Sequence, residues 1–239
     1  MSQKLYLESP YEKEFEAEVI AVSENGIRLS QSLFYPTSGG QPGDMGKLIA
    51  ANDEIMIATT VKGEAPDDVW HIPAEGSATP QVGSILKGHI DWDTRYKHMR
   101  MHTAMHLLCS IVEGYATGGQ ISAEKSRLDF NIPAGAYDKE GVTEQLNALI
   151  KQDHPISTSW ITDEELESNP DLVRTMSVKP PMGTGKVRVV QIGTEDNIVD
   201  YQPCGGTHVQ STREIGDILV RKIENKGKQN KRFQIIFAE

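Results

Sequence analysis

The sequence predicts two domains: a small all-β, barrel-like domain over residues 1–90, followed by an α+β domain over residues 91–239. Short apolar runs separated by turn residues fill the first part of the chain, which is typical of a small barrel or sandwich. Near Asp91 the pattern changes to stretches of helical periodicity that alternate with strands. At 239 residues the chain can bury one large core or two modest ones.

The first domain is predicted from a series of short strands. FEAEVIAV (15–22) and IRLSQSLFY (27–35) flank Asn25-Gly26, a dipeptide that is a strong signal for a hairpin turn. Further short runs follow, spaced by Gly, Pro, Asp and Asn: GKLIA (46–50), EIMIATTV (54–61) and SILKGHI (84–90). Between them lies YPTSGGQPGDMG (35–46), which is too rich in Gly and Pro to form an element. It is interpreted either as a loop whose backbone approaches a ligand closely or as an ordinary barrel corner.

The second domain is predicted to begin with an amphipathic helix over residues 95–115, because apolar side chains such as Met101 and Met105 recur at helical spacing. Gly114 and then Thr117-Gly118-Gly119 are expected to end this helix. The remaining predicted elements are a strand over 125–130, a helix over 141–152, a strand over 154–161, short helical pieces over 163–176, strands over 186–193 and 197–201, and a closing hairpin of 214–227 with 228–239.

The charge of the chain is acidic overall but unevenly distributed. The formal net charge of -10 argues against a polyanionic partner for the molecule as a whole. Residues 213–232, however, hold seven basic and only three acidic side chains. This segment either contacts a phosphate backbone or forms a solvated hairpin edge kept soluble by its lysines.

The lack of a recognisable targeting signal and the presence of only two cysteines predict an intracellular protein. No stretch approaches the roughly 18 to 20 apolar residues of a membrane span, and the N-terminal residues lack the pattern of a signal peptide. We therefore expect a soluble, cytoplasmic protein without a membrane partner. Cys109 and Cys204 do not make a disulfide framework, so a metal-binding or catalytic use of at least one is expected.

Two pairs of potential metal ligands stand far apart in the sequence. His102 and His106 lie four residues apart on the predicted helix, so both imidazoles can reach one ion. Cys204 and His208 have the same spacing in the segment PCGGTHV, whose glycines allow a tight turn. Three imidazole nitrogens and one thiolate suit zinc. Each pair alone is weak evidence, since helix histidines are more often surface or core residues, but together they predict one zinc site.

These motifs resemble those of a known family. RMHTAMHLL (100–108) followed by the distant CGGTHV (204–209) is similar to the editing domain of alanyl-tRNA synthetase and to its free-standing relatives, the AlaX-type alanyl-tRNA editing proteins. FYPTSGGQPGD (34–44) resembles the glycine-rich motif of the medium-length free-standing members. SRLDF and STREIGDILVRKIENKGK also fit, so the resemblance covers nearly the whole chain. It implies that the α+β domain is an editing domain with a zinc-binding helix.

The resemblance implies a trans-editing aminoacyl-tRNA deacylase, which hydrolyses the ester of Ser-tRNA(Ala), with Gly-tRNA(Ala) as a second candidate substrate, and spares Ala-tRNA(Ala). A hydrolytic site is needed because an alanine pocket excludes glycine poorly and rejects one added hydroxyl by only about two orders of magnitude. The implied cofactor is one Zn²⁺ per chain, bound by His102, His106, Cys204 and His208. Four protein ligands are typical of a closed structural site, so the zinc is either catalytic, through expanded or loosened coordination, or anchors the substrate. No general base is evident, and the catalytic residues stay unassigned.

The resemblance also suggests residues that contact the substrate. Gly39 and Gly40 match the glycine motif that is expected to face the active site. Discrimination against alanine requires a group that reads the serine hydroxyl, and the candidates are Thr103, Gln120 and Ser122.

Two further roles are predicted outside the ligand set. Asp200 is a candidate for orienting a metal ligand through a hydrogen bond. The acceptor stem of mischarged tRNA(Ala) is expected to contact the basic cluster near the C-terminus, whose members are Arg221, Lys222, Lys226, Lys228, Lys231 and Arg232. Because recognition of an RNA helix relies on shape and backbone contacts, an acidic protein is compatible with this role. The oligomeric state is left open.

Two alternative functions are compatible with the same motifs. Threonyl-tRNA synthetases carry a related editing domain, whose substrate would be Ser-tRNA(Thr), although the glycine motif and CGGTHV favour the alanine branch. A zinc-stabilised tRNA-binding module without catalysis would carry the same ligands. Replacing Cys204 by Ala would unfold such a module, whereas in an editing enzyme it would abolish hydrolysis while much of the fold persists.

Overall fold

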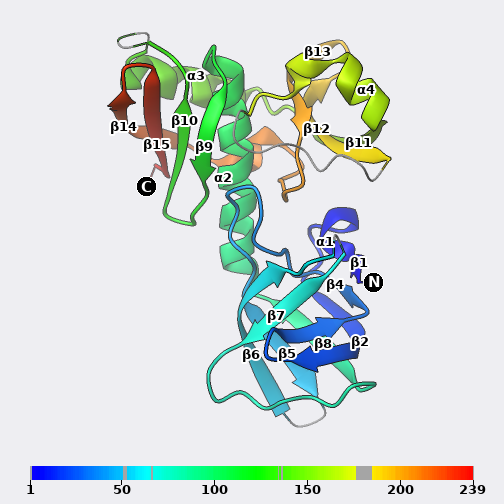
Figure 1. The fold of residues 1–239 in the computed structure, drawn as a ribbon. Helices are drawn as coiled ribbons and strands as arrows, with labels where there is room; N and C mark the ends of the chain where they lie inside the picture. The colour runs from blue at the N-terminus through cyan, green and yellow to red at the C-terminus, as the bar shows by residue number, and fades with distance from the viewer. Residues whose placement is uncertain are drawn as a thin grey trace. The chain divides into compact units, whose positions relative to one another are not determined.

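The computed structural model describes residues 2–50, 53–65, 67–133, 135, 137–175 and 185–238. The chain forms two compact units, Met1–His98 and Met99–Glu239. The first is a closed all-β barrel and the second is an α+β unit (Figure 1). This architecture confirms the predicted fold class.

Six antiparallel strands close the barrel in the order β2-β3-β7-β6-β5-β8. Their bounds are β2 (Glu14–Ser23), β3 (Gly26–Leu29), β5 (Gly46–Ala50), β6 (Asp53–Lys62), β7 (Val69–Pro73) and β8 (Ile85–Ile90). On β2, Phe15, Ala17 and Val19 alternate with exposed glutamates and pack into the core. The predicted hairpin at Asn25-Gly26 joins β2 to β3, and Gly26 adopts a φ of 113°, which glycine accommodates best.

The barrel differs from the prediction in two places. The run over 27–35 is not one strand: Ser30 donates its N–H to Glu18 and its carbonyl accepts from Gln3, so the chain turns away after β3. The short β4 (Gln31–Ser32) then pairs in parallel with β1 (Gln3–Lys4), which leads into α1 (Leu5–Glu8). Strand β7 was not predicted, because a five-residue run that ends in proline carries too little periodicity.

A buried ion pair fixes the end of the loop over 35–46. The guanidinium of Arg95, in the first turns of α2 (Trp92–Ile111), binds the carboxylate of Asp44 with both side chains almost fully buried. The same carboxylate accepts the backbone N–H of Tyr35 at 2.6 Å. The first turns of α2 therefore belong to the barrel unit, whereas the sequence predicts a domain boundary near residue 90.

Two sheets and three helices form most of the second unit. The four-stranded sheet has the order β14-β15-β10-β9 and the three-stranded sheet the order β11-β12-β13. The strands are β9 (Ala116–Gln120), β10 (Lys125–Phe130), β11 (Ile156–Thr162), β12 (Lys186–Thr194), β13 (Asn197–Pro203), β14 (Ile218–Gly227) and β15 (Asn230–Phe237). The remaining elements are α3 (Lys139–Lys151), α4 (Asp163–Ser168), and the 3-10 turns η1 (Pro170–Leu172) and η2 (Thr212–Ile215).

Most of the predicted elements of this unit are present. Strands over 125–130 and 154–161 and the closing hairpin appear as β10, β11 and the β14–β15 pair. The predicted helix over 141–152 is α3, which begins two residues earlier because Asp138 caps it by accepting the N–H of Gly141. The helical pieces over 163–176 are α4 and η1, and Met176 lies outside the described residues.

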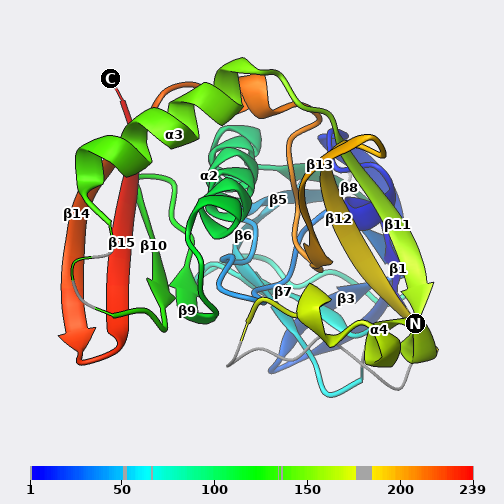
Figure 2. The ribbon, with the colours of Figure 1, turned by 90° about the horizontal axis from the view of Figure 1, so that it is seen from above.

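Helix α2 is the central element of this unit, and it departs from the predicted amphipathic pattern. Every residue from Met101 to Cys109 is buried, because these turns lie between the two sheets (Figures 1 and 2). The helix ends at Ile111, and Thr117–Gly119 form part of β9 rather than a helix end. A Cβ on Gly119 would lie 3.2 Å from the Met105 side chain, so glycine lets β9 approach α2 closely.

None of the helices within the described residues combines the length and the apolar character needed to cross a membrane.

Candidate metal centre

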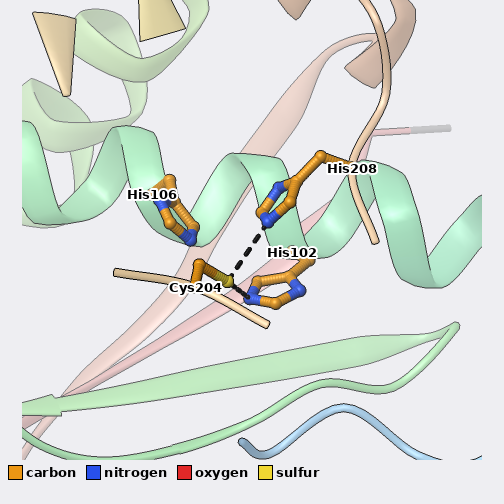
Figure 3. Close-up of side chains that lie close together, drawn as sticks. All are labelled: His102, His106, Cys204 and His208. Carbon is orange, nitrogen blue, oxygen red and sulfur yellow. Dashed lines mark hydrogen bonds between the residues drawn. The ribbon is translucent and has the colours of Figure 1, made fainter. Parts of the chain in front are cut away.

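Four predicted ligands meet in the second unit. His102 and His106 come from α2, while Cys204 and His208 come from the turn that follows β13 (Figure 3). One potential ligand atom from each lies within 4.8 Å of all the others. The Cys204 sulfur is 3.5 Å from Nε2 of His102 and 3.3 Å from Nε2 of His208. All three histidines are buried, so these groups are held in one arrangement by the surrounding protein.

A carboxylate and an amide orient His106. Its Nδ1 lies 2.8 Å from Oδ2 of Asp200, so the ring donates its proton to the carboxylate and directs Nε2 toward the cluster. Gln202, two residues further along β13, donates to the same carboxylate oxygen at 2.9 Å. Alternate residues of a strand share a face, which is why Asp200 and Gln202 both reach α2.

A threonine on α2 orients His208. The hydroxyl of Thr103 donates to the carbonyl of Met99 at 3.0 Å, so its oxygen accepts from Nδ1 of His208 at 3.1 Å. Nε2 of His208 is then the atom that faces the Cys204 sulfur. Thr103 was predicted as a reader of the substrate hydroxyl, but its own hydroxyl is occupied with positioning a histidine.

The turn that carries Cys204 is held by β12. Arg188 on β12 donates through Nη1 to the carbonyls of Cys204 and Gly206, at 2.8 and 3.0 Å. The N–H of Gly206 also points at the Cys204 sulfur, at 3.4 Å. These contacts stabilise the turn and place a hydrogen-bond donor at the sulfur, which favours its thiolate form.

The charges within the cluster favour a thiolate. Burial raises the pKa of the Cys204 thiol, but the imidazoles of His102, His208 and His106 outweigh it and hold this pKa well below its usual range. Burial lowers the pKa of His106, yet the Cys204 thiolate and the Asp200 carboxylate raise it to about 10. The pKa of His208 is held well below its usual range by burial and by the charge of His102. A metal ion binds the thiolate and neutral imidazoles, so its binding would release the proton that His106 holds.

This donor set fits a metal ion, and zinc in particular. Three imidazole nitrogens and one sulfur converge in a buried site, and two of the imidazoles have their other ring nitrogen anchored.

Two of the predicted substrate residues lie on β9 and in the turn after it. Gly119 faces α2, so the neighbouring Gln120 points to the opposite side of the sheet, where its Oε1 accepts from Arg127 at 3.2 Å. Gln120 is exposed, and its contact with the substrate stays a prediction. Ser122 lies in a tight turn with Ser126, where its carbonyl accepts from the Ser126 hydroxyl at 3.2 Å. Its role as a hydroxyl reader stays a prediction.

Gly39 and Gly40 form the tip of a tight turn in the barrel unit. Both have positive φ values, 56° and 85°, and Ser38 and Gln41 on either side exchange two backbone hydrogen bonds. Both residues are exposed, and the turn conformation by itself explains why glycine occupies each position. A contact of this turn with substrate stays a prediction.

The basic cluster on β14 and β15 is smaller than predicted. Lys231 is only 4% exposed, so it cannot contact a phosphate backbone. Arg232 makes a two-pronged ion pair with the Asp129 carboxylate on β10, at 2.8 Å for each nitrogen–oxygen contact. The exposed members are Arg221, Lys222, Lys226 and Lys228, of which Lys222 and Lys226 lie 2.7 and 3.9 Å from Glu224.

Two residues of the centre were missed by the sequence reasoning, Gln202 and Arg188. The signal for Gln202 was incomplete: it follows Asp200 by two residues and shares its face, but the predicted strand ended at residue 201, whereas β13 extends to Pro203. Arg188 gave no signal, since its role depends on the register by which β12 brings it beside Cys204.

Comparisons with known proteins agree with this arrangement. The family described as "Threonyl and Alanyl tRNA synthetase second additional domain" matches residues 187–234, the region that holds Cys204, His208 and Asp200. The family described as "tRNA synthetases class II (A)" matches residues 2–94, which includes the barrel.

Full-length relatives identify the family. The alanyl-tRNA editing protein AlaX-M of Methanosarcina acetivorans is 36% identical over 242 residues, which cover 97% of each chain. AlaX-M of Saccharolobus solfataricus is likewise 36% identical, again over 97% of each chain. The alanine–tRNA ligase of Archaeoglobus fulgidus is 36% identical over 94% of this chain but only 24% of its own length. The chain belongs to the AlaX-M family of alanyl-tRNA editing proteins.

Proposed function

We propose that this protein is a trans-editing deacylase that hydrolyses the ester of Ser-tRNA(Ala), with Gly-tRNA(Ala) as a second candidate substrate, and spares Ala-tRNA(Ala). The observation that carries the proposal is the buried, oriented cluster of three histidines and one cysteine. It occurs in a chain that matches proteins named for alanyl-tRNA editing over nearly its whole length.

The proposed cofactor is one zinc ion per chain, held by His102, His106, Cys204 and His208. When bound, zinc would supply a Lewis acid at the point where the ester is cleaved, or an anchor that orients the ester. The ester is intrinsically labile, so the remaining work of the protein is to position it.

The chain's own residues contribute orientation. Asp200 binds Nδ1 of His106, and Thr103 binds Nδ1 of His208. Each hydrogen bond fixes the orientation of its imidazole ring, so that Nε2 is directed at the centre. Because the Thr103 hydroxyl is occupied, Gln120 and Ser122 are the remaining candidates for reading the serine hydroxyl.

We propose that the tRNA contacts the exposed basic side chains of the β14–β15 hairpin. Four of the six predicted residues qualify by exposure: Arg221, Lys222, Lys226 and Lys228. Because Lys222 and Lys226 share Glu224 as an ionic neighbour, their net attraction for phosphate is moderated, and this contact is expected to position the RNA and to weaken with salt.

The test is the deacylation, by the zinc-loaded protein, of tRNA(Ala) charged with serine, glycine or alanine and of Ser-tRNA(Thr). We expect rapid hydrolysis of the seryl ester, with the alanyl ester cleaved no faster than in buffer. Cys204→Ala, assayed at the same concentration, serves as the inactive control. If the protein binds tRNA but leaves every ester intact, it is a binding module. If it cleaves only Ser-tRNA(Thr), it belongs functionally to the threonine branch.

A further inference from the structure

A tryptophan stands exposed on the three-stranded sheet of the metal centre. Trp160, on the edge strand β11, keeps 53% of its surface exposed. Tryptophan supplies a large apolar contact area wherever its ring becomes covered, so an exposed indole on this sheet can contribute to binding a flat substrate group.

The register of the sheet places this indole on the face of the metal centre. Trp160 lies opposite Arg188 on β12, and Thr158 lies opposite Val190, which in turn lies opposite Gln202. Residues directly opposite each other share a face, as do alternate residues of one strand. Gln202 contacts His106, so this face of the sheet is the one that packs against the histidines of α2.

The indole also lies at a suitable distance from the cluster. The backbone of Arg188 accepts the N–H of Cys204, which makes Trp160, Arg188 and Cys204 neighbours across three successive segments. Two strand spacings separate Trp160 from Cys204, roughly 10 Å. This is the span of one nucleoside, from its base to the ester on its ribose.

The surroundings of the ring favour a base over a phosphate. Lys186 places its ammonium 5.0 Å from the ring centroid, but α4 begins directly after β11 with Asp163, Glu164 and Glu165. Three carboxyl groups in this turn work against a polyanion, whereas an indole beside a cation accepts a flat, neutral ring system by stacking.

We propose that Trp160 is the stacking platform for the base of the nucleoside at the 3′ end of the tRNA, whose ribose carries the ester. The inference rests on the proposed function and adds to it a binding subsite on β11. Stacking of the base on the indole fixes the direction of the ribose and brings its ester to the metal centre.

The test compares Trp160→Ala with Trp160→Phe, which keeps a ring, and with Ile198→Ala. Ile198 is a matched control because it is a comparably exposed apolar residue, at 52%, on the other edge strand of the same sheet. We expect Trp160→Ala to raise the KM for Ser-tRNA(Ala) by about 5- to 150-fold with kcat nearly unchanged. Trp160→Phe should keep most of the affinity, and Ile198→Ala should match the unsubstituted protein.

A second measurement reports on the subsite without catalysis. In the Trp70→Phe, Trp92→Phe variant, Trp160 is the sole indole of the chain's three. The non-hydrolysable amide analogue of seryl-adenosine should quench its fluorescence, and the corresponding serine amide without a nucleoside should not.

The outcomes separate the two proposals. Normal hydrolysis by a folded Trp160→Ala protein, with no quenching, overturns the subsite and leaves the deacylase function standing. Quenching by the analogue in a protein that hydrolyses no ester overturns the deacylase and keeps the subsite. Loss of affinity in Ile198→Ala equal to that in Trp160→Ala would also reject a specific role for the indole.

Discussion

Each of the two units buries a polar cluster, and the two clusters differ in which groups converge at their centres. In the barrel, the Arg95 guanidinium donates to the Asp44 carboxylate and to the carbonyls of Leu33 and Pro10, so donors and acceptors match. In the second unit, hydrogen bonds fix the outer nitrogens of His106 and His208, while potential ligand atoms of all three histidines and of Cys204 lie within 4.8 Å of one another.

The difference separates a structural cluster from a binding one. The Arg95–Asp44 cluster is complete by itself and stabilises the barrel only while both partners are present. In the histidine–cysteine cluster, one potential metal-ligand atom from each of four side chains lies within 4.8 Å of the others, so the cluster can bind a cation. The chemistry of the groups that converge therefore distinguishes the two roles.

The largest expected effect comes from removing the sulfur. Cys204→Ala should abolish stoichiometric zinc binding and reduce deacylation by more than the roughly 10- to 100-fold typical of losing a partner outside the metal shell. Metal content by atomic absorption and single-turnover hydrolysis measure both effects. The comparison would be wrong if the variant retained one tightly bound zinc ion per chain.

The next largest effect is expected in the barrel. Arg95→Ala leaves the Asp44 carboxylate buried without its counter-ion and should lower the free energy of unfolding by about 3–5 kcal/mol. Lys47→Ala is the control, because its pair with Glu54 is exposed and should be worth about 1 kcal/mol or less. Urea unfolding followed by circular dichroism measures both variants, and equal losses would contradict the distinction between buried and exposed pairs.

A second structural cluster of the barrel should respond to pH. His71 donates Nδ1–H to the Ile27 carbonyl and accepts the Ser32 hydroxyl at Nε2, and burial lowers its pKa from 6.5 to about 4. Between about pH 4 and 6.5, His71 is therefore protonated in the unfolded chain and neutral in the folded barrel. The stability contributed by the neutral ring is complete above about pH 6.5, falls as the pH drops, and is lost by about pH 4, a change of about 3 kcal/mol.

The variant His71→Asn isolates this dependence. Asparagine can keep the donor to Ile27 but does not titrate, so the loss of stability on acidification should shrink by about the same 3 kcal/mol. Unfolding free energies measured across this pH range test it. An unchanged slope would mean that other groups carry the acid sensitivity.

The smallest effect is expected outside the ligand set. Asp200→Asn keeps the size of the side chain but removes the carboxylate charge beside His106, and should weaken metal affinity by about 10- to 100-fold. Competition with a chelator of known affinity measures it. A loss as large as that of Cys204→Ala would show that Asp200 acts as a ligand rather than as a support.

The sequence was most informative where chemistry and periodicity coincide. The clustering of the three histidines with Cys204 could be predicted because each pair lies four residues apart, a spacing that brings two side chains to one face of a helix. The hairpin at Asn25-Gly26 could be predicted because the turn chemistry is local.

Features that depend on tertiary packing could not be predicted from the sequence. The burial of Lys231 and the occupied hydroxyl of Thr103 follow from contacts with segments distant in sequence. Helix α2 appeared amphipathic because its histidines and threonine count as polar, although they face a buried centre. A row of polar residues along one face of a helix does not by itself indicate that this face is exposed to solvent.

The separation of the two ligand pairs has a consequence for how the protein is made. His102 leaves the peptidyl-transferase centre 102 residues before Cys204. At bacterial and eukaryotic elongation rates of about 5–20 residues per second, roughly 5 to 20 seconds pass in which the helix histidines exist without their partners. Two imidazoles do not hold an ion tightly, so an ion at this centre would bind only after Cys204 and His208 have been synthesised.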